Sequence, residues 1–387
     1  MEKMSPAEMA QQILNAVKKE YESLKTLNVM ILGKTGVGKS TLINNMFNEK
    51  MADTGVGKPV TRNIKKITKP GFPLAIYDTP GLELGGENGL DSLLDQVVGE
   101  IQSGIETGDV SQAIHVIWYC IGTPSHRIEE SEIAFLRNLH NRTGLYHIPV
   151  IVVLTQSYSK QDAHNLYHAI EKENLPIVNI VPVLAENYHI DDDYTARAYG
   201  LEDLSLLMNN VIPDAVKNTF IAVQRVNLDL KNKRANAVVV TAATAAAATG
   251  AIPIPFSDAF ALVPEQIAMI AGIAATYGVP LDVASITALI SATIGTAGTT
   301  VLGKTIVSNL IKLIPGVGSV AGGMISATTA AALTAALGEA FIFVMNQICK
   351  GNMKVSDLST PEGMQMMTSA FNDRLKIKRD KTGKVVE

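Results

Sequence analysis

The residues of this chain best suited to binding phosphate form one glycine-rich stretch. Gly33-Lys34-Thr35-Gly36-Val37-Gly38-Lys39-Ser40 has the spacing G-x-x-x-x-G-K-[ST]. Glycines let a backbone curl around phosphate oxygens, so that successive N–H groups point inward. A lysine at the position of Lys39 can reach the terminal phosphates, and a hydroxyl at the position of Ser40 can ligate Mg²⁺. Residues 33–40, with the adjoining Thr41, are therefore expected to hold a nucleotide.

The elements on either side of this stretch fit that chemistry. An apolar run, residues 27–32, precedes it, and Thr41-Leu42-Ile43-Asn44-Asn45-Met46-Phe47 follows it. The pattern predicts a strand, a tight turn and the start of a helix. The new helix adds the positive end of its dipole to the inward-pointing N–H groups.

A second candidate for this site is Asp78-Thr79-Pro80-Gly81, which follows a short apolar strand over 74–77. An acid at the end of a strand can hold Mg²⁺ through water, and the Gly81 N–H can sense a γ-phosphate. The motif is weak alone, but it becomes strong after a phosphate loop, with a threonine-bearing loop over 51–62 in between.

The rest of the first half alternates between strand and helix patterns. We expect a strand over 63–69 at a sheet edge, further strands over 113–121, 148–155 and 176–184, and helices over 90–105, 128–142, 160–171 and 201–221. Such alternation predicts an α/β fold whose mostly parallel sheet has helices on both faces. Ligands of such sheets bind at the carboxyl ends of the strands. Gly33, Asp78, Thr155 and Ala185 lie at such ends, so one site should collect them.

Composition and charge narrow the class of protein. A chain of 387 residues has room for about two domains. Its formal charge of −4 argues against a broad nucleic-acid footprint, and no nucleic-acid partner is expected. The two cysteines, Cys120 and Cys349, form no disulfide framework, and residues 1–20 lack an apolar core of secretory length. These features predict a cytoplasmic protein. An amphipathic helix over 6–25 is expected to pack beside the first domain.

The composition changes after Lys231-Asn232-Lys233-Arg234. Charge-free runs over 235–257, 283–303 and 313–338 are each long enough to cross a bilayer core of about 30 Å. Each run is also diluted by proline, glycine, serine or threonine, as in tightly packed helix pairs. Two interpretations stay open: an all-α, Ala/Gly-rich domain whose helices bury one another, or helices that insert into or lie on a membrane.

The first half resembles a small GTPase domain of the Era-like and dynamin-like branch. The resemblance covers about 27–220 and rests on the phosphate loop, on Pro59-Val60-Thr61-Arg62 and on Asp78-Thr79-Pro80-Gly81. It implies GTP/GDP and Mg²⁺ as ligands. It also makes Thr61 the threonine that ligates Mg²⁺ beside the γ-phosphate, with Ser40 and Asp78 as the other metal-holding residues. Lys39 and Thr61 would be the catalytic residues, and the loop after Gly81 would be a second switch.

The sequence departs from that family where the base is read. The family motif N/T-K-x-D corresponds to Thr155-Gln156-Ser157-Tyr158, which has no acid. The pair Ala185-Glu186 stands where a Ser-Ala pair usually closes the base pocket. Thr155, Gln156, Ala185 and Glu186 remain the expected base-side residues. A preference for guanine is therefore inherited from the resemblance, and ATP stays open as an alternative ligand.

A second departure concerns hydrolysis. Leu82 stands where some GTPases carry a water-positioning glutamine. Intrinsic turnover should then be slow, and Arg62 and Lys34 are candidate helpers.

The second half also resembles a known domain. A proline turn beginning at Ile252, followed by Pro264-Glu265-Gln266-Ile267-Ala268-Met269-Ile270, is similar to the uncharacterised alanine-rich helical domain found behind bacterial Era-like GTPases. The expected organisation is an N-terminal helix over 1–26, a GTP-binding domain over 27–222, the helical domain over 223–350 and a tail over 351–387.

Together these patterns predict a GTP-hydrolysing switch whose helical half carries the nucleotide state to a membrane or to a second copy. Candidate partners besides the guanine nucleotide are membrane lipid and, through the nucleotide domain, a homodimer. The expected location is the cytoplasm, with the inner face of a membrane as a candidate. The alternative is a membrane or oligomer scaffold that binds nucleotide with negligible turnover.

Overall fold

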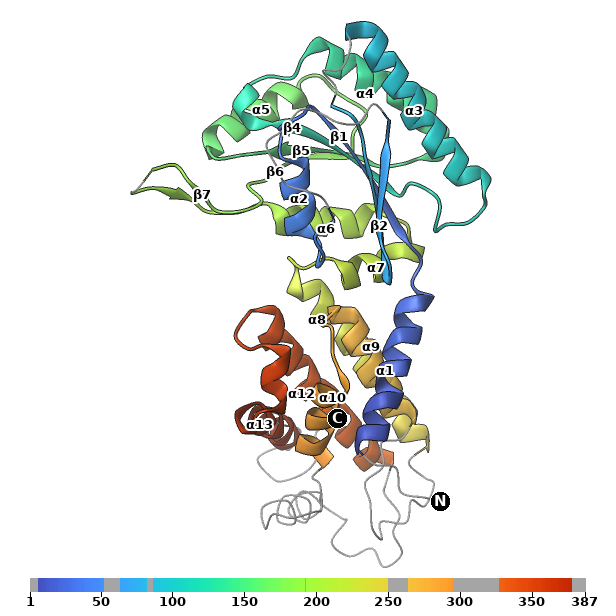
Figure 1. Ribbon diagram of the computed structural model, residues 1–387, viewed down its shortest axis with the longest axis vertical. Helices are drawn as coiled ribbons and strands as arrows, with labels where there is room; N and C mark the ends of the chain where they lie inside the picture. The colour runs from blue at the N-terminus through green and yellow to red at the C-terminus, as the bar shows by residue number, and fades with distance from the viewer. Residues whose placement is uncertain are drawn as a thin grey trace, which may run out of the picture. The chain divides into compact units, whose positions relative to one another are not determined.

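The computed structural model describes residues 6–51, 63–81, 86–191, 193–249, 264–294 and 327–377. The chain divides into two compact units, one formed by residues 22–227 and the other by residues 1–21 together with 228–387. The first unit is a sheet covered by helices, and the second is a cluster of helices (Figure 1). The expected fold class, an α/β domain followed by an all-α domain, is confirmed.

The first unit is built on a six-stranded sheet with the order β2-β3-β1-β4-β5-β6. The strands are β1 (Leu27–Gly33), β2 (Lys65–Lys69), β3 (Phe72–Asp78), β4 (Val116–Gly122), β5 (Val150–Thr155) and β6 (Asn179–Pro182). All neighbours pair in parallel except β2, which is antiparallel to β3. The lysines of β2 are exposed, as is common on an edge strand because their charge discourages pairing with another chain. The carboxyl ends of β1, β3, β4 and β5 therefore meet at one edge of the sheet.

Helices cover both faces of this sheet. On one face α3 (Gly86–Glu106), α4 (Glu130–Thr143) and α5 (Lys160–Glu171) bury apolar residues against the strands. On the other face lie α2 (Lys39–Met46), α6 (Leu201–Val211) and α7 (Asp214–Val223). Trp118 of β4 anchors that second face. It stacks on Phe47 with ring centroids 5.9 Å apart, and its indole N–H donates to the Met208 sulfur.

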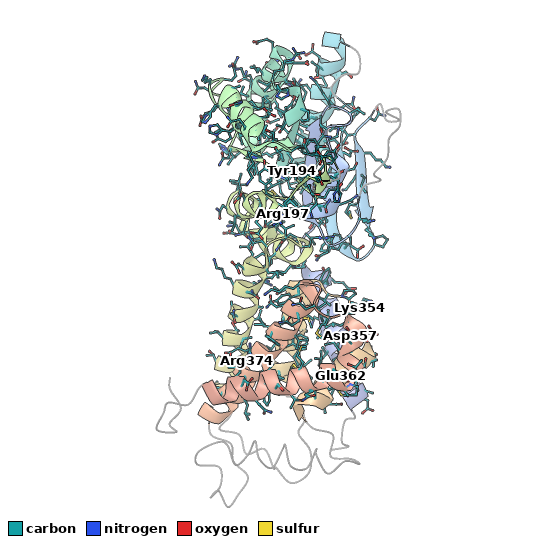
Figure 2. All side chains as sticks on the ribbon, turned by 90° about the vertical axis from the view of Figure 1, so that its left-hand side faces the viewer. Tyr194, Arg197, Lys354, Asp357, Glu362 and Arg374 are labelled. Atoms are coloured by element: carbon teal, nitrogen blue, oxygen red, sulfur yellow. The ribbon has the colours of Figure 1, made fainter. Side chains whose placement is uncertain are left out.

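Two local features of the first unit differ from the sequence-based prediction. The single helix expected over 201–221 is two helices, because Pro213 lacks an N–H and its ring holds the preceding Ile212 in an extended conformation. After β6 the chain also forms a small antiparallel hairpin of β7 (Tyr188–His189) and β8 (Thr195–Ala196), near whose tip lies Tyr194 (Figure 2). Short 3₁₀ turns, η1 (Thr123–Ser125) and η2 (Gly144–Tyr146), flank α4.

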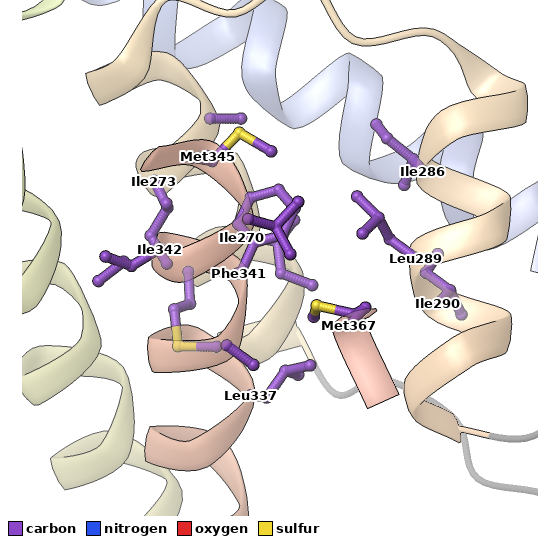
Figure 3. Packing of buried hydrophobic residues seen from close by; sticks show 14 of the residues in the cluster. Ile270, Ile273, Ile286, Leu289, Ile290, Leu337, Phe341, Ile342, Met345 and Met367 are labelled. Atoms are coloured by element: carbon purple, nitrogen blue, oxygen red, sulfur yellow. The ribbon is translucent and has the colours of Figure 1, made fainter. Parts of the chain in front are cut away.

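The second unit is a helical cluster around one apolar core. Its helices are α1 (Pro6–Ser23), α8 (Leu228–Thr249), α9 (Pro264–Tyr277), α10 (Val283–Ile294), α12 (Ala327–Cys349) and α13 (Pro361–Ile377), with the 3₁₀ turn η4 (Val355–Ser359). Figure 3 shows Phe341 of α12 packed among Ile270 of α9, Leu289 of α10 and Met367 of α13. Near the start of η4, the Lys354 N–H donates to the Asp357 carboxylate at 2.8 Å (Figure 2).

Both ends of the described chain contribute to this helical core. Met9, Ala10 and Ile13 of α1 are buried in it, so the expectation that this helix packs beside the first domain is wrong. The physical reason is that α2 to α7 already cover both faces of the sheet, which leaves no broad apolar face there for the α1 stripe. At the other end, Leu358 and Phe371 from the expected tail are buried in the same core.

One described helix is long and apolar enough to cross a membrane by length and composition alone. The stretch Ala331–Cys349 of α12 has this length and composition, and 56 % of its apolar 18-residue segment is buried within the structure. A core helix of a water-soluble domain can have the same length and composition, so α12 leaves both interpretations of the second half open. Residues 250–263 and 295–326, which include the proline turn and much of the second and third charge-free runs, lie outside the described residues.

The basic stretch Lys231-Asn232-Lys233-Arg234, in the first turns of α8, contains a buried lysine. Lys231 is 1 % exposed, and its ammonium donates to the carbonyl oxygens of Thr276 and Tyr277, both at 3.1 Å. These carbonyls end α9, where the helix dipole is negative and favours a cation. Nearby, the Asn346 side-chain amide donates to Oδ1 of Asn232 at 2.7 Å and to the Tyr277 hydroxyl at 3.0 Å. Burial lowers the pKa of Lys231 to about 7.

The low pKa of Lys231 predicts a pH dependence of stability. Between pH 7 and the ordinary lysine value of 10.5 the unfolded chain binds the proton and the folded chain does not, so the contribution of Lys231 to the free energy of unfolding rises with pH and is flat below 7. The difference in the free energy of unfolding between wild type and Lys231→Met, measured in urea, should rise by about 2 kcal/mol in favour of wild type between pH 7 and pH 9. A difference that stays constant over this range would contradict the buried, neutralised lysine.

Candidate nucleotide-binding site

The glycine-rich stretch forms the turn between β1 and α2. Gly33 closes β1 with φ at 141°, and a Cβ on it would lie 2.4 Å from the Cys120 carbonyl oxygen of β4. Gly38 immediately precedes α2 with φ at 93°, in the left-handed region that favours glycine. The glycines at these two positions thus allow the end of β1 to lie close against the paired strand β4 and the chain to turn sharply into the helix. The first N–H groups of α2 have no acceptor within the helix and can bind an anion.

Lys39 folds back over the loop. Its ammonium donates to the carbonyl oxygens of Gly33 at 2.7 Å and of Lys34 at 3.1 Å. Ser40 and Thr41 follow in the first turn of α2. The ammonium and the helix start therefore border the same turn, as the sequence predicts.

Asp78 ends β3 beside β1, where it pairs in register with Ile31. Its Oδ1 is buried and has no hydrogen-bond partner among the described residues. Burial raises the pKa of Asp78, while the charges of Lys39 and Lys65 oppose the rise. The Thr79 hydroxyl donates to the Ile31 carbonyl oxygen at 3.0 Å and fixes the exit from the strand.

The Asp78 carboxylate fits the sequence-predicted magnesium site. A buried carboxylate oxygen without a donor is suited to the water shell of a divalent cation, and Ser40 offers a hydroxyl from α2. Gly81, which follows, is buried. Thr61, Arg62 and Leu82, the other switch residues named from the sequence, lie outside the described residues.

The expected base side of the site touches the phosphate loop directly. Gln156 has φ at 53°, unusual for a residue with a side chain, and its amide donates to the Gly36 carbonyl oxygen at 2.9 Å. The Thr155 hydroxyl, at the end of β5, donates to the Ile121 carbonyl oxygen at 3.2 Å. Ser157 turns inward, where its hydroxyl is 2.8 Å from that of Thr123. Gln156 therefore bridges β5 and the loop.

A pair of tyrosines lies next to Gln156. The rings of Tyr158 and Tyr188 have centroids 4.2 Å apart and are tilted by 38°. Burial, then Tyr188, then the nearby carboxylate of Glu186 raise the pKa of Tyr158. Glu186 is exposed and Ala185 is half-buried. The sequence did not single out Tyr188; its signal is the unusual density of tyrosines at 188, 194 and 199.

Lys34 points to the start of α4. Its ammonium lies 2.7 Å from the Glu129 carboxylate and 3.4 Å from that of Glu132. The sequence suggested Lys34 as a helper in hydrolysis, but did not identify these acids. The E-x-x-E spacing of 129–132, which forms a capping box at the start of α4, was the available signal.

Two family models match this chain. Residues 28–156 match a family described as 50S ribosome-binding GTPase, and residues 217–369 match a domain of unknown function, DUF697. The chain is 30 % identical over 165 residues to GTPase Era of Pseudomonas fluorescens. The matched region covers 42 % of this chain and 50 % of that protein. It is 25 % identical over 173 residues to Translocase of chloroplast 34 of Arabidopsis thaliana, covering 44 % and 52 %. The chain thus spans about half the length of the curated relatives it matches.

The solved structures that are similar to this chain include Era and a probable GTP-binding protein engB. Era in complex with MgGDPNP and nucleotides 1506–1542 of 16S ribosomal RNA is 20 % identical, with a TM-score of 0.34, and the match covers 57 % of this chain and 67 % of that one. A probable GTP-binding protein engB is also 20 % identical, with a TM-score of 0.33 and coverage of 48 % and 97 %.

The close approach of Gly33 to β4 predicts unequal effects of two alanine substitutions. Both Gly33 and Gly36 have positive φ, but a Cβ on Gly36 meets nothing within 4 Å. Gly36→Ala should therefore cost about 1 kcal/mol of backbone strain, and Gly33→Ala at least about 2 kcal/mol more because strands β1 and β4 must separate. Urea unfolding without nucleotide measures both. Equal losses would mean that the contact of Gly33 with β4 does not constrain the loop.

Proposed function

This chain carries an Era-like GTPase domain followed by a helical DUF697 domain, and we propose that it binds GTP with Mg²⁺ and hydrolyses it to GDP and phosphate. The observation that carries the proposal is the meeting of Lys39, Asp78 and Gln156 around one glycine-rich turn at the carboxyl ends of β1, β3 and β5. Open parallel sheets bind ligands at such edges.

Each part of the turn has a role in this proposal. Backbone N–H groups of residues 35–39 cradle the phosphates, and the Lys39 ammonium offsets charge that develops on the β- and γ-phosphate oxygens. Ser40 and Thr61 would ligate Mg²⁺, and Asp78 would hold one of its waters. When bound there, Mg²⁺ would neutralise part of the phosphate charge. The Gly81 N–H would contact the γ-phosphate, so loss of that group would release the loops around Thr61 and Gly81.

Hydrolysis in this proposal is attack of water on the γ-phosphorus, with the bond to the β–γ bridging oxygen breaking and its electron pair leaving on GDP. Leu82 has no polar group with which to orient that water. The turnover of the isolated protein should therefore be slow and rise when a partner, or a second copy of the chain, supplies a polar group.

Guanine is the base we propose, and Glu186 is its reader. Guanine presents two neighbouring N–H donors where adenine presents an acceptor, so a carboxylate favours guanine. Glu186 is the only acidic residue among residues 155–160 and 183–189. The Glu186 charge contributes to the raised pKa of Tyr158, so Glu186 lies near the end of the segment 155–158. Ala185 would border the base. A solvent-exposed reader predicts a smaller preference for GTP over ATP than a buried carboxylate would give, which keeps ATP as the alternative ligand.

The second candidate function is a nucleotide-bound scaffold with negligible turnover. It draws on the apolar character of α12 and on the helical cluster, which could serve a membrane or a homodimer. In either case we propose a cytoplasmic protein, with the inner face of a membrane as a candidate location. Phosphate release at high protein concentration, with and without liposomes, separates the two functions. A rate equal to spontaneous hydrolysis in every condition favours the scaffold.

The phosphate-binding role of Lys39 predicts loss of nucleotide binding in Lys39→Ala. The variant removes the ammonium that spans the turn, so the heat of GTP·Mg²⁺ binding in calorimetry should disappear. Lys50→Ala, a lysine beyond the end of α2, serves as the control and should bind as wild type does. Micromolar affinity retained by Lys39→Ala would contradict the assignment of the loop.

The proposed role of Glu186 predicts a change in base preference. In competition between GTP and ATP, Glu186→Gln should lower the ratio of affinities by about 10-fold, because one charged hydrogen-bond acceptor is lost. The control Glu202→Gln changes an exposed acid of α6, away from Glu186 in the sequence, and should leave the ratio unchanged. If Glu186→Gln keeps the wild-type ratio, base reading lies elsewhere.

A further inference from the structure

Lys34 and two acids at the start of α4 form a clamp on the phosphate loop. The Lys34 ammonium is 2.7 Å from the Glu129 carboxylate and 3.4 Å from that of Glu132. Lys34 is the residue directly after Gly33, and its own carbonyl oxygen accepts a hydrogen bond from Lys39. The clamp therefore begins within the turn that contains the phosphate-binding lysine.

Glu132 is the fixed point of this clamp. Its side chain is 4 % exposed, and its carboxylate accepts the Glu129 N–H at 3.0 Å and the Tyr119 hydroxyl at 3.4 Å. Tyr119 is fully buried in β4, so the carboxylate is attached at once to the sheet and to the first turn of α4. A buried carboxylate is stable when it has donors and a cation, and Lys34 is the cation in contact with it.

Electrostatics shows that the pairing is mutual. Burial alone would lower the pKa of Lys34, yet the two carboxylates outweigh burial and raise it. The hydrogen bond from Lys34 in turn lowers the pKa of Glu129. Both groups are therefore charged at neutral pH, and the ion pair persists over the range in which the protein would bind nucleotide.

We propose that Lys34 is a positioning residue, which holds the phosphate loop open to nucleotide by pairing with Glu129, the N-cap of α4, and with Glu132 of its first turn rather than by touching phosphate. The clamp keeps the loop carbonyls and the Lys39 ammonium in place before the ligand arrives, so less ordering is needed on binding. It also links the nucleotide loop to the start of α4. This inference rests on the proposed nucleotide binding.

The proposal and its direct alternative give opposite signs for one variant. If the clamp positions the loop, Glu129→Gln loosens it, and both GTP and GDP should dissociate about 3- to 10-fold faster. If Lys34 instead binds phosphate, Glu129→Gln frees its charge, and dissociation should slow, more for GTP than for GDP. Stopped-flow release of fluorescent GTP and GDP from the full chain measures both. Slower or unchanged release in Glu129→Gln would overturn the proposal.

A double-mutant cycle adds a readout that a general loss of stability would not produce. Lys34→Met should speed release as Glu129→Gln does, and the double variant should be no faster than Lys34→Met alone, because the same contact is removed. Lys34→Arg, which keeps the charge, should restore release to within about twofold of wild type. Additive effects in the double variant would count against the clamp.

Two controls separate this test from that of the proposed function. Glu130→Gln removes an exposed carboxylate of α4 next to Glu129, and it should leave the release rates unchanged. Wild-type protein that binds neither GTP nor GDP would contradict the proposed function itself. Wild-type binding with no effect of Glu129→Gln would contradict the clamp alone.

Discussion

The first unit depends on how the glycine-rich turn is held in shape, by its own Lys39 and by contacts from three other parts of the fold. Lys39 donates to the carbonyl oxygens at the start of the turn, and Gln156 donates to the one at its middle, on Gly36. Lys34 is held by the acids of α4, and Gly33 lies against the backbone of β4. Apart from the bonds of Lys39, these contacts come from β4, from the residue after β5 and from the start of α4, so the order of strands in the sheet and the shape of the turn depend on each other. A turn fixed in this way presents backbone N–H groups at little entropic cost.

Much of this arrangement could be predicted from the sequence because local chemistry determines it. The motif over 33–40, the acid at Asp78 and the alternation of strands and helices each require specific residue types at short spacing. The base side was predicted by position, and the structure adds that Gln156 reaches Gly36. The break between α6 and α7 at Pro213 also has a local signal in the sequence, because the residue before a proline disfavours the helical conformation.

The remaining features depend on contacts between residues far apart in the chain. The stripe of α1 fits any apolar surface, and the choice of the helical core follows only from which surfaces other helices already cover. The sequence around Lys231 is typical of an exposed basic stretch, yet its ammonium is buried and donates to the carbonyl groups at the end of α9. Glu132 reads as an ordinary helix-capping acid. Its role beside Lys34 requires the parallel pairing of β1 and β4, which no local pattern specifies.

The central claim is that backbone groups of residues 33–41, together with Lys39, bind a triphosphate. Amide hydrogen exchange followed by mass spectrometry tests this claim most directly, because it reports on those N–H groups themselves. With GTP·Mg²⁺ added, peptides covering 33–41 should exchange at least about 10-fold more slowly, whereas peptides of α6 should not change. Saturating GTP·Mg²⁺ that leaves exchange over 33–41 as it was in the free protein would contradict the account.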